Sequence, residues 1–360
     1  MSDKKIAVLG LGYVGLPLAV QLSLSYQVKG FDLDNNRVSQ LRKGIDKTLE
    51  VNESLLRRQL NSSLSIYTDE GKLANCNFFI ATVPTPINNK KKPDFTALKK
   101  VCETIGRLLK PNDTVIFEST VYPGATEEIC APILEKYSKN LESGKDFFLG
   151  YSPERVNPGD KVHTIDKINK VISGQNKNVE KNLMEIYSKV TSGKVYLAKS
   201  IKVAEASKVI ENAQRDINIA FVNEVAKICK KINISSFDVL DASLTKWNFL
   251  DFKPGLVGGH CIGVDPYYLA EKAQMLKIRP EVILSGRNTN DKMVEFVGKE
   301  ISKRLSRNSK CLFLGVTFKE NVPDLRNSKS IDLMNFLNKK HNIYFYDPFV
   351  KKLEGFKNLI

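Results

Sequence analysis

The chain has 360 residues, 42% of them hydrophobic, so it can bury a large core, and its length predicts two or three domains. Its 55 Lys and Arg against 40 Asp and Glu give a net charge of +15, but the basic residues are dispersed and form no stripe interleaved with aromatics. We therefore expect a lysine-rich surface that attracts anions, and no nucleic-acid binding. No apolar stretch reaches the length of a membrane span, which predicts a cytoplasmic protein without membrane insertion.

The first expected element is a nucleotide-binding turn between two strands. An apolar run over 5–9 enters glycines spaced G-x-G-x-x-G at Gly10, Gly12 and Gly15, and a helical pattern precedes a second strand that ends at Asp32. The first glycine permits a tight turn, the second lets a pyrophosphate approach the backbone, and the third lets the helix pack on the strand. The helix N-terminus then faces the phosphates. This pattern predicts a dinucleotide-binding domain.

The choice of dinucleotide depends on Asp32. A carboxylate at this place accepts hydrogen bonds from the adenosine ribose and repels a 2′-phosphate, which favours NAD over NADP. Arg37, five residues later, leaves the other preference open, because an arginine can bind such a phosphate. The apolar start also resembles a signal peptide, but the glycines, Pro17 and Asp32 interrupt it and no small-residue cleavage pattern follows.

Strand and helix patterns alternate through about residue 197. Strands are expected at 78–81, 114–117, 147–150, 170–173 and 194–197, with helices over 96–109 and 126–138. This βαβ alternation predicts a doubly wound parallel sheet.

Polar loops follow three of these strands, over 81–86, 118–124 and 150–155. Open α/β sheets bind ligands at the carboxyl ends of their strands. For any single loop the alternative is that its Thr and Pro residues only form turns. Three loops in series favour a shared site.

A long helix is expected from about Ile201 to Ile232. Its apolar residues recur at helical spacing, and Glu205, Lys208, Asn212, Arg215 and Asp216 lie largely on the opposite face. Lys208 and Asn212 are one turn apart, so both can point at one ligand. The alternative is a solvated helix face.

Cys261 is followed four residues later by Asp265, on a segment rich in glycine. A thiol with a nearby carboxylate, on backbone that a ligand can approach closely, suits covalent catalysis at a carbonyl carbon. The six cysteines show no C-x-x-C spacing and the three histidines no ligand spacing, so neither a disulfide framework nor a metal site is expected.

From residue 310 a second α/β section begins, with strands over 311–316 and 342–347 around a helix from about Ser330. The predicted fold is α/β, in three parts. Residues 1–200 form a Rossmann-like NAD-binding domain, 201–306 an all-helical central domain with the long connecting helix, and 307–360 a partial Rossmann-like nucleotide-sugar domain.

Together these motifs resemble the UDP-glucose/GDP-mannose dehydrogenase family. The matches run in family order along nearly the whole chain. They are the glycine turn with Tyr13 and Val14, residues 83–86, 119–121, 152–154, 205–212, 258–265, 314–319 and 324–326. One branch of the family, which acts on UDP-N-acetylhexosamines with a GlcNAc or GalNAc sugar, is the most similar in detail. The resemblance to this branch lies in the sequences of residues 152–160, 210–216, 245–249 and 258–268.

Two features of the sequence depart from the family pattern. Pro158 stands where the glucose-directed enzymes often carry a second Glu, which argues against glucose. Family members also continue beyond the strand that ends at Asp347. From this we expect an incomplete C-terminal domain, or a sheet finished in an unusual way, with NAD binding retained and UDP-sugar binding weakened.

The resemblance implies a four-electron oxidation of the sugar C6 with NAD as acceptor. Asp265, with Lys208, removes the hydroxyl proton, and Cys261 forms a thiohemiacetal and then a thioester. Lys208 and Asn212 stabilise the oxyanions, and Glu154 with Thr120 activates the hydrolytic water. The product would serve bacterial surface-polysaccharide synthesis.

The resemblance also assigns contacts and an assembly state. The expected cofactor contacts are Gly10, Gly12, Tyr13, Val14, Gly15, Asp32, Arg37, Thr85, Thr120 and Arg326. The expected contacts of the UDP-N-acetylhexosamine are Glu154, Arg155, Lys208, Asn212, Lys246, Trp247, Phe249, Gly258 and Lys319. The central helices of the family form a dimer, so a homodimer is expected.

Two other classes of function stay open. A β-hydroxyacid dehydrogenase shares the NAD fold, a long helix and a Lys–Asn pair, yet makes one two-electron oxidation without a cysteine. A catalytically impaired nucleotide-binding protein is the second. Two NADH per sugar would argue against the first, and any turnover against the second.

Overall fold

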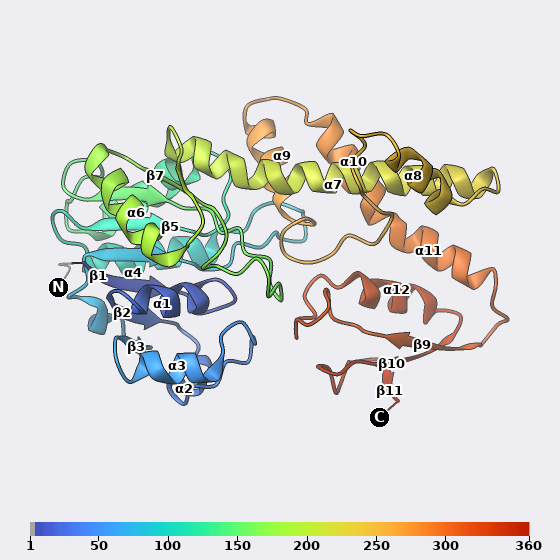
Figure 1. Ribbon diagram of the computed structural model, residues 1–360, viewed down its shortest axis with the longest axis horizontal. Coiled ribbons are helices and arrows are strands. Elements are labelled where there is room, and N and C mark those ends of the chain that lie inside the picture. The colour runs from blue at the N-terminus through green and yellow to red at the C-terminus, as the bar shows by residue number, and fades with distance from the viewer. Residues whose placement is uncertain (1–3, 360) are drawn as a thin grey trace. The chain divides into compact units, whose positions relative to one another are not determined.

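The computed structural model describes residues 4–359 and separates into two compact units, Met1–Val209 and Ile210–Ile360 (Figure 1). The first unit contains an eight-stranded sheet in the order β3-β2-β1-β4-β5-β6-β7-β8. Its strands are β1 (Lys5–Leu9), β2 (Gln27–Phe31), β3 (Leu64–Tyr67), β4 (Phe78–Ala81), β5 (Thr114–Phe117), β6 (Phe148–Tyr151), β7 (Lys170–Gly174) and β8 (Val195–Leu197). The strand order reverses between β1 and β4, and such a switch point is where doubly wound sheets bind nucleotides.

The sequence pattern predicted a parallel sheet, and this prediction is wrong for one pair of strands. Strand β7 runs antiparallel to β6, whereas every other neighbouring pair is parallel. Parallel neighbours need a crossover, usually a helix, but residues 152–169, which link β6 to β7, form none. The chain therefore turns back and β7 runs beside β6 in the opposite direction.

Helices cover this sheet. They are α1 (Gly15–Ser23), α2 (Asn35–Arg42), α3 (Glu53–Leu60), α4 (Thr96–Leu108), α5 (Ala131–Tyr137) and α6 (Lys177–Val190). Helices α1 and α6 contact each other, as do α4 and α5. Because helices cover the sheet, β1 and β4 are buried and read as apolar runs. The helix expected over 126–138 begins as a π-helical turn, Thr126–Cys130, before α5.

One long helix, α7 (Ile201–Lys231), crosses from the first unit into the second and agrees with the predicted 201–232 (Figure 1). The alternative of a solvated polar face is wrong for four of its five polar residues. Glu205, Lys208, Asn212 and Asp216 are all buried, and only Arg215 is exposed. Buried charges require partners, so this face has a structural or chemical role.

The second unit continues with α8 (Ser236–Leu244), α9 (Asp265–Met275), α10 (Glu281–Asp291) and α11 (Met293–Ser302). A parallel sheet follows in the order β11-β10-β9, made of β9 (Lys310–Leu314), β10 (Asn342–Tyr346) and β11 (Lys357–Asn358). Side chains of α12 (Lys329–Leu337) share a buried core with β10. The short β11 was not foreseen, because two residues are too few for a recognisable pattern.

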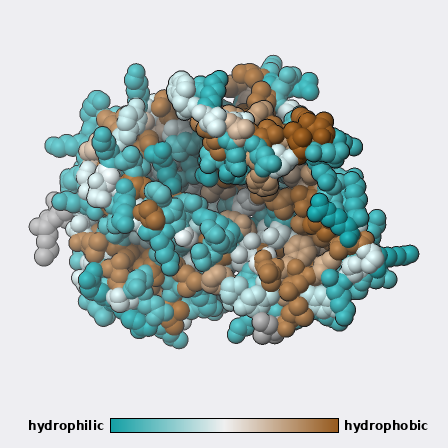
Figure 2. Space-filling model, turned by 45° about the vertical axis from the view of Figure 1, so that its right-hand side comes forward, coloured by the Kyte–Doolittle hydropathy of each residue, from teal (hydrophilic) through white to brown (hydrophobic). Residues whose placement is uncertain are grey.

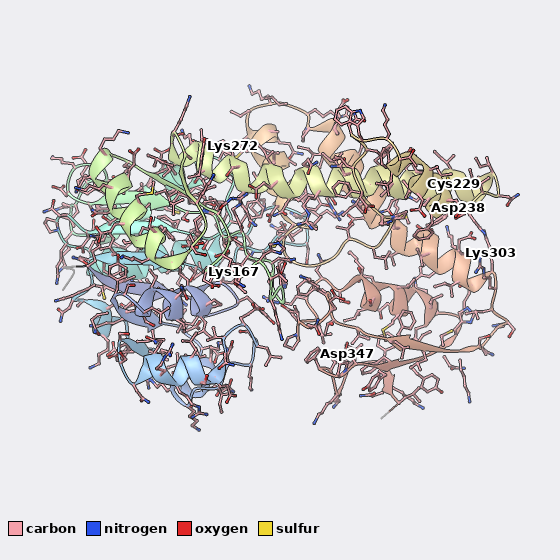
Figure 3. All side chains as sticks on the ribbon, viewed as in Figure 1. Lys167, Cys229, Asp238, Lys272, Lys303 and Asp347 are labelled. Atoms are coloured by element: carbon pink, nitrogen blue, oxygen red, sulfur yellow. The ribbon has the colours of Figure 1, made fainter. Side chains whose placement is uncertain are left out.

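The turn after β1 recurs after β9. Gly10 and Gly315 both have positive φ, +98° and +88°, and their amides donate to Phe31 and Tyr346. The next amide in each turn, that of Leu11 or Val316, donates to a carboxylate 2.8 Å away, Asp32 or Asp347. Asp347 is labelled at the end of β10 in Figure 3. Each unit therefore contains the start of a Rossmann-like crossover.

Hydrophilic side chains dominate the face in Figure 2, interrupted by smaller apolar areas. Among the described residues, no helix has both the length and the apolar character that crossing a membrane requires.

Candidate active site

A pocket of about 450 Å³ opens in the first unit beside the switch point of the sheet. It is lined by the ends of β1 and β2, the loop after β4 and the side of α4, including Gly10, Asp32, Pro84, Asp94 and Lys100. The sequence motifs had indicated the first three, whereas the α4 side came from packing alone.

The glycine turn leaves room for a ligand on its outer side. A Cβ on Gly15 would lie 1.8 Å from the Gly10 carbonyl oxygen, so glycine is required there, while a Cβ on Gly12 would meet nothing within 4 Å. Tyr13 and Val14 follow, and Val14, at the N-cap of α1, supplies no side-chain hydrogen bond. The open backbone at Gly12 and the uncapped helix start suit a pyrophosphate. The residues present therefore fit a dinucleotide cofactor.

Asp32 and Arg37 both bind the main chain of Leu11 in this turn. One oxygen of Asp32 accepts from the Leu11 amide at 2.8 Å, and Arg37 Nε donates to the Leu11 carbonyl at 2.9 Å. Arg37 also pairs with Asp46 at 2.8 Å. Burial alone would raise the pKa of Asp46, but hydrogen bonds from Thr48 and Arg37 outweigh it and lower the pKa. The structure thus gives Arg37 a role in positioning the turn.

Replacing Asp32 with alanine is expected to weaken NAD binding by roughly tenfold to a hundredfold, since hydrogen bonds to a charged group are lost. The relative use of NADP should improve, because a negative charge next to the 2′-position disappears. Calorimetric titration of both cofactors measures this. Asp34→Ala, which removes the cap of α2, is the matched control and should leave the preference unchanged. An unchanged preference in Asp32→Ala would remove Asp32 from the site.

The loops after β4 and β5 bind each other. Thr85 Oγ1 donates to the Thr120 carbonyl at 2.7 Å, and Ser119 Oγ donates to the Val83 carbonyl at 2.7 Å. Glu205 on α7 accepts from the main-chain amides of Gly124 and Thr126. Burial raises the pKa of Glu205 to about 7. These loops therefore form one connected edge with the start of α7, more than a set of isolated turns.

Glu154, in the loop after β6, is nearly buried. Its Oε1 accepts from the Arg155 amide at 2.6 Å, and its Oε2 lies 3.7 Å from Lys170 Nζ. Lys170 binds Glu118, which also accepts from the Tyr187 hydroxyl. Sequence reasoning missed Lys170 and Tyr187, because each stands in an ordinary strand or helix pattern; only Glu118, in the predicted polar loop, carried a signal.

Asp265 and Asn212 form a buried pair in the second unit. Asn212 Nδ2 donates to Asp265 Oδ2 at 2.6 Å, and the Asp265 amide donates to the Cys261 carbonyl at 2.8 Å. Cys261 is partly exposed, directly before α9, whereas Asp265 is only 2% exposed. Lys208, also buried, precedes Asn212 by one turn of α7. The structure thus brings the thiol segment, a carboxylate and an amide together.

The segment 324–327 contacts the glycine-rich loop that carries Cys261, residues 255–264, called the thiol loop below. Asn327 Nδ2 donates to the Gly259 carbonyl at 2.8 Å, and a Cβ on Gly258 would lie 2.5 Å from the Asn327 carbonyl oxygen. His260 Nε2 lies 2.9 Å from Asp324 Oδ2. Arg326 also binds Asp324, at 2.6 Å. Burial would raise the pKa of Asp324, but hydrogen bonds from His260 and Arg326 hold it well below its usual range.

Asp324→Asn should loosen this loop, because the charged acceptor of His260 and Arg326 is lost. We expect backbone amides of 255–264 to exchange hydrogen roughly tenfold faster, which mass spectrometry of peptides measures. Asp332→Asn, which removes the exposed partner of Lys329, is the control. Unchanged exchange in Asp324→Asn would show that the contact does not restrain the loop.

The other residues expected at a substrate site differ in how much of each side chain is exposed to solvent. Trp247 is 92% exposed, so it is not a core tryptophan. Lys246 and Arg155 are exposed or partly so, and Arg155 donates to the Asn169 carbonyl at 3.3 Å. Phe249 and Lys319 are partly buried. Among residues 4–359, no group of three or more His, Cys, Asp or Glu side chains is placed to hold a metal ion.

Residues 4–191 match the NAD binding domain of the UDP-glucose/GDP-mannose dehydrogenase family, 202–292 its central domain and 312–358 its UDP binding domain. The chain belongs to this family. The NAD-binding match confirms the predicted cofactor, and the three matches confirm the predicted α/β class with a central helical section.

Individual relatives in the family are similar over nearly the whole chain. The UDP-N-acetyl-D-glucosamine 6-dehydrogenase of Pseudomonas aeruginosa is 51% identical over 97% of this chain and 84% of its own length. Protein CapL of Staphylococcus aureus is 50% identical over 99% of this chain and 84% of its own. The solved UDP-N-acetyl-mannosamine dehydrogenase of Staphylococcus aureus superposes with a TM-score of 0.85 at 31% identity, over 98% of this chain and 84% of that one.

Proposed function

We propose that this protein oxidises C6 of UDP-N-acetylglucosamine to the uronic acid in two steps, with NAD accepting a hydride in each. Relatives named as UDP-N-acetyl-D-glucosamine 6-dehydrogenases are 51% and 49% identical, whereas those named for UDP-N-acetyl-D-mannosamine reach 34%. UDP-N-acetylgalactosamine, its C4 epimer, remains the second candidate, because the two sugars differ in one hydroxyl orientation.

The observation that carries this proposal is the linkage of Cys261 to the Asp265–Asn212 pair. Asp265 takes the hydroxyl proton in the first oxidation. The Cys261 thiolate then adds to the aldehyde carbon to give a thiohemiacetal, and the second oxidation leaves a thioester. Asn212 and the Lys208 ammonium donate to the oxyanion of each tetrahedral species.

Residues of the first unit act in the release of the product and in cofactor binding. Glu154, with Thr120, takes a proton from the water that attacks the thioester. Thr85 and Arg326 join the glycine turn and Asp32 in holding the cofactor. Lys319, Arg155, Gly258 and the segment 246–249 contact the nucleotide sugar. We further propose the division into 1–200 for NAD, 201–306 for the helical core and 307–360 for the nucleotide.

A stoichiometric assay tests the function. Purified protein is incubated with NAD and a limiting amount of each UDP-N-acetylhexosamine or of UDP-glucose, and NADH and the acidic product are counted. Two NADH per UDP-N-acetylglucosamine are expected. One NADH per sugar would favour the β-hydroxyacid type of oxidation, and no turnover on any sugar would favour a nucleotide-binding protein without catalysis.

We also propose a cytoplasmic homodimer that supplies surface-polysaccharide synthesis. Six free cysteines are compatible with a reducing compartment. In the second unit, α7 exposes large apolar side chains, including Phe221 at 58% and Ile228 at 55%. A second copy would cover such side chains. Analytical ultracentrifugation of wild type and Phe221→Ser tests the dimer.

A further inference from the structure

A buried cluster of ionisable side chains adjoins Glu154 in the first unit. Lys170 begins β7, Glu118 follows β5 and Tyr187 lies on α6, and none of the three is more than 1% exposed. Charged side chains are almost never fully buried unless they are paired. The mechanism above uses none of these three residues, although the cluster contacts one that it does use.

Lys170 is anchored by two of its neighbours. Its Nζ donates to Glu118 Oε2 at 2.9 Å, and it lies 5.1 Å from the centre of the Tyr187 ring. The Tyr187 hydroxyl donates to the other oxygen of Glu118. Glu118 and Tyr187 therefore fix the position of the ammonium, which also faces Glu154 Oε2 at 3.7 Å.

The two oxygens of Glu154 have different surroundings. Oε1 accepts from the main-chain amides of Arg155 and Val156, which fixes the plane of the carboxylate. Oε2 is buried and receives no hydrogen bond from any residue between 4 and 359. A carboxylate whose plane is fixed by two amides and whose buried oxygen faces a cation is held in one orientation, as a general base for water requires.

We propose that Lys170 is a positioning residue for Glu154: anchored by Glu118 and Tyr187, its ammonium balances the charge of the Glu154 carboxylate and faces its buried Oε2, so that the carboxylate stays oriented for the hydrolytic water. This inference rests on the proposed function. In the step concerned, Glu154 takes one proton from water, the water oxygen bonds to the thioester carbon, and the carbon–sulfur bond breaks. Cys261 leaves as a thiolate.

The charge balance of the cluster supports this role. Burial raises the pKa of Glu118 to about 7, although Lys170 opposes the shift. Burial alone would lower the pKa of Lys170, but Glu118 and Glu154 outweigh it and raise the pKa. Lys170 thus stays charged through the neutral range. Without it, Glu118 would have no cation beside it in a buried site and would hold its proton to still higher pH.

The test separates hydrolysis from the oxidations in Lys170→Met, which keeps an unbranched side chain of similar length and removes its charge. Rapid mixing with NAD and UDP-N-acetylglucosamine should give a burst of two NADH per site, followed by steady turnover about a hundredfold slower than wild type. Intact-protein mass spectrometry should then detect the sugar adduct on Cys261.

Two further variants separate positioning from folding. Lys170→Met combined with Glu118→Gln removes one charge of each sign, so its stability should recover while hydrolysis stays slow. Lys29→Met on β2, where the ammonium donates to the Lys72 carbonyl, is the matched control and should turn over normally. Recovery of hydrolysis in the double variant, or an equal loss of burst and steady rate in Lys170→Met, would overturn the inference. Absence of the two NADH in wild type would overturn the proposed function, and the inference with it.

Discussion

Replacing Cys261 with serine is expected to lower steady-state formation of the uronic acid by about a thousandfold or more. Only a thiolate forms the covalent adduct from which the second hydride is removed, and a serine hydroxyl remains protonated at neutral pH. The variant keeps the glycine-rich backbone. The Asp265 amide donates a 2.8 Å hydrogen bond to the main-chain carbonyl of residue 261, and this bond does not involve the sulfur. Binding of NAD should therefore be unchanged.

The measurement is product formation by chromatography together with NADH release. Cys311→Ser is the matched control, because Cys311 is also partly exposed in the second unit and lies on β9, outside the thiol loop. It should retain wild-type turnover. A Cys261→Ser enzyme that makes uronic acid at near wild-type rate would rule out the thioester route.

The second large effect is on stability. Arg287→Met should lower the free energy of unfolding by about 3–5 kcal/mol, because it leaves a buried carboxylate without its cation. Arg287 on α10 is 2% exposed and donates to Asp216 of α7 and to Asp291. Asn290 also donates to Asp216, at 2.7 Å, so one amide would remain. Denaturant unfolding measures the loss.

The deficit should grow with pH. Burial already raises the pKa of Asp216 in spite of Arg287, and removing the cation raises it further. A carboxyl whose pKa is higher in the folded state contributes most at acid pH and loses that contribution as pH rises through its folded pKa. The Arg287→Met deficit should thus be smaller near about pH 5 than near about pH 8.

Two variants control this experiment. Arg279→Met removes an exposed arginine near the same helix and should change stability by less than about 1 kcal/mol. Asp216→Asn combined with Arg287→Met removes both charges and should recover much of the loss. A pH-independent deficit would show that packing of the arginine, more than the charge of Asp216, determines the effect.

How much of this protein was predictable differs between its parts. The glycine turn, with Asp32 just after the next strand, was predicted where the structure has it, because its conformation is local: it depends on residue type at fixed spacing. The 31-residue helix α7 was also found, to within one residue at its end, since its apolar spacing persists over many turns. The antiparallel β7 was missed, because a strand's own residues carry no sign of its direction.

By itself, the sequence determined the family and most of the elements, and it led to the proposal of Cys261 and Asp265 as the reactive groups. Only the tertiary structure decided which distant side chains those groups meet. Asn212 and Asp265 are 53 positions apart, and Glu118 and Lys170 are 52 apart, yet each pair is hydrogen-bonded and buried. The physical reason is that a buried charge is stable only with a partner, and folding brings that partner from another strand or helix.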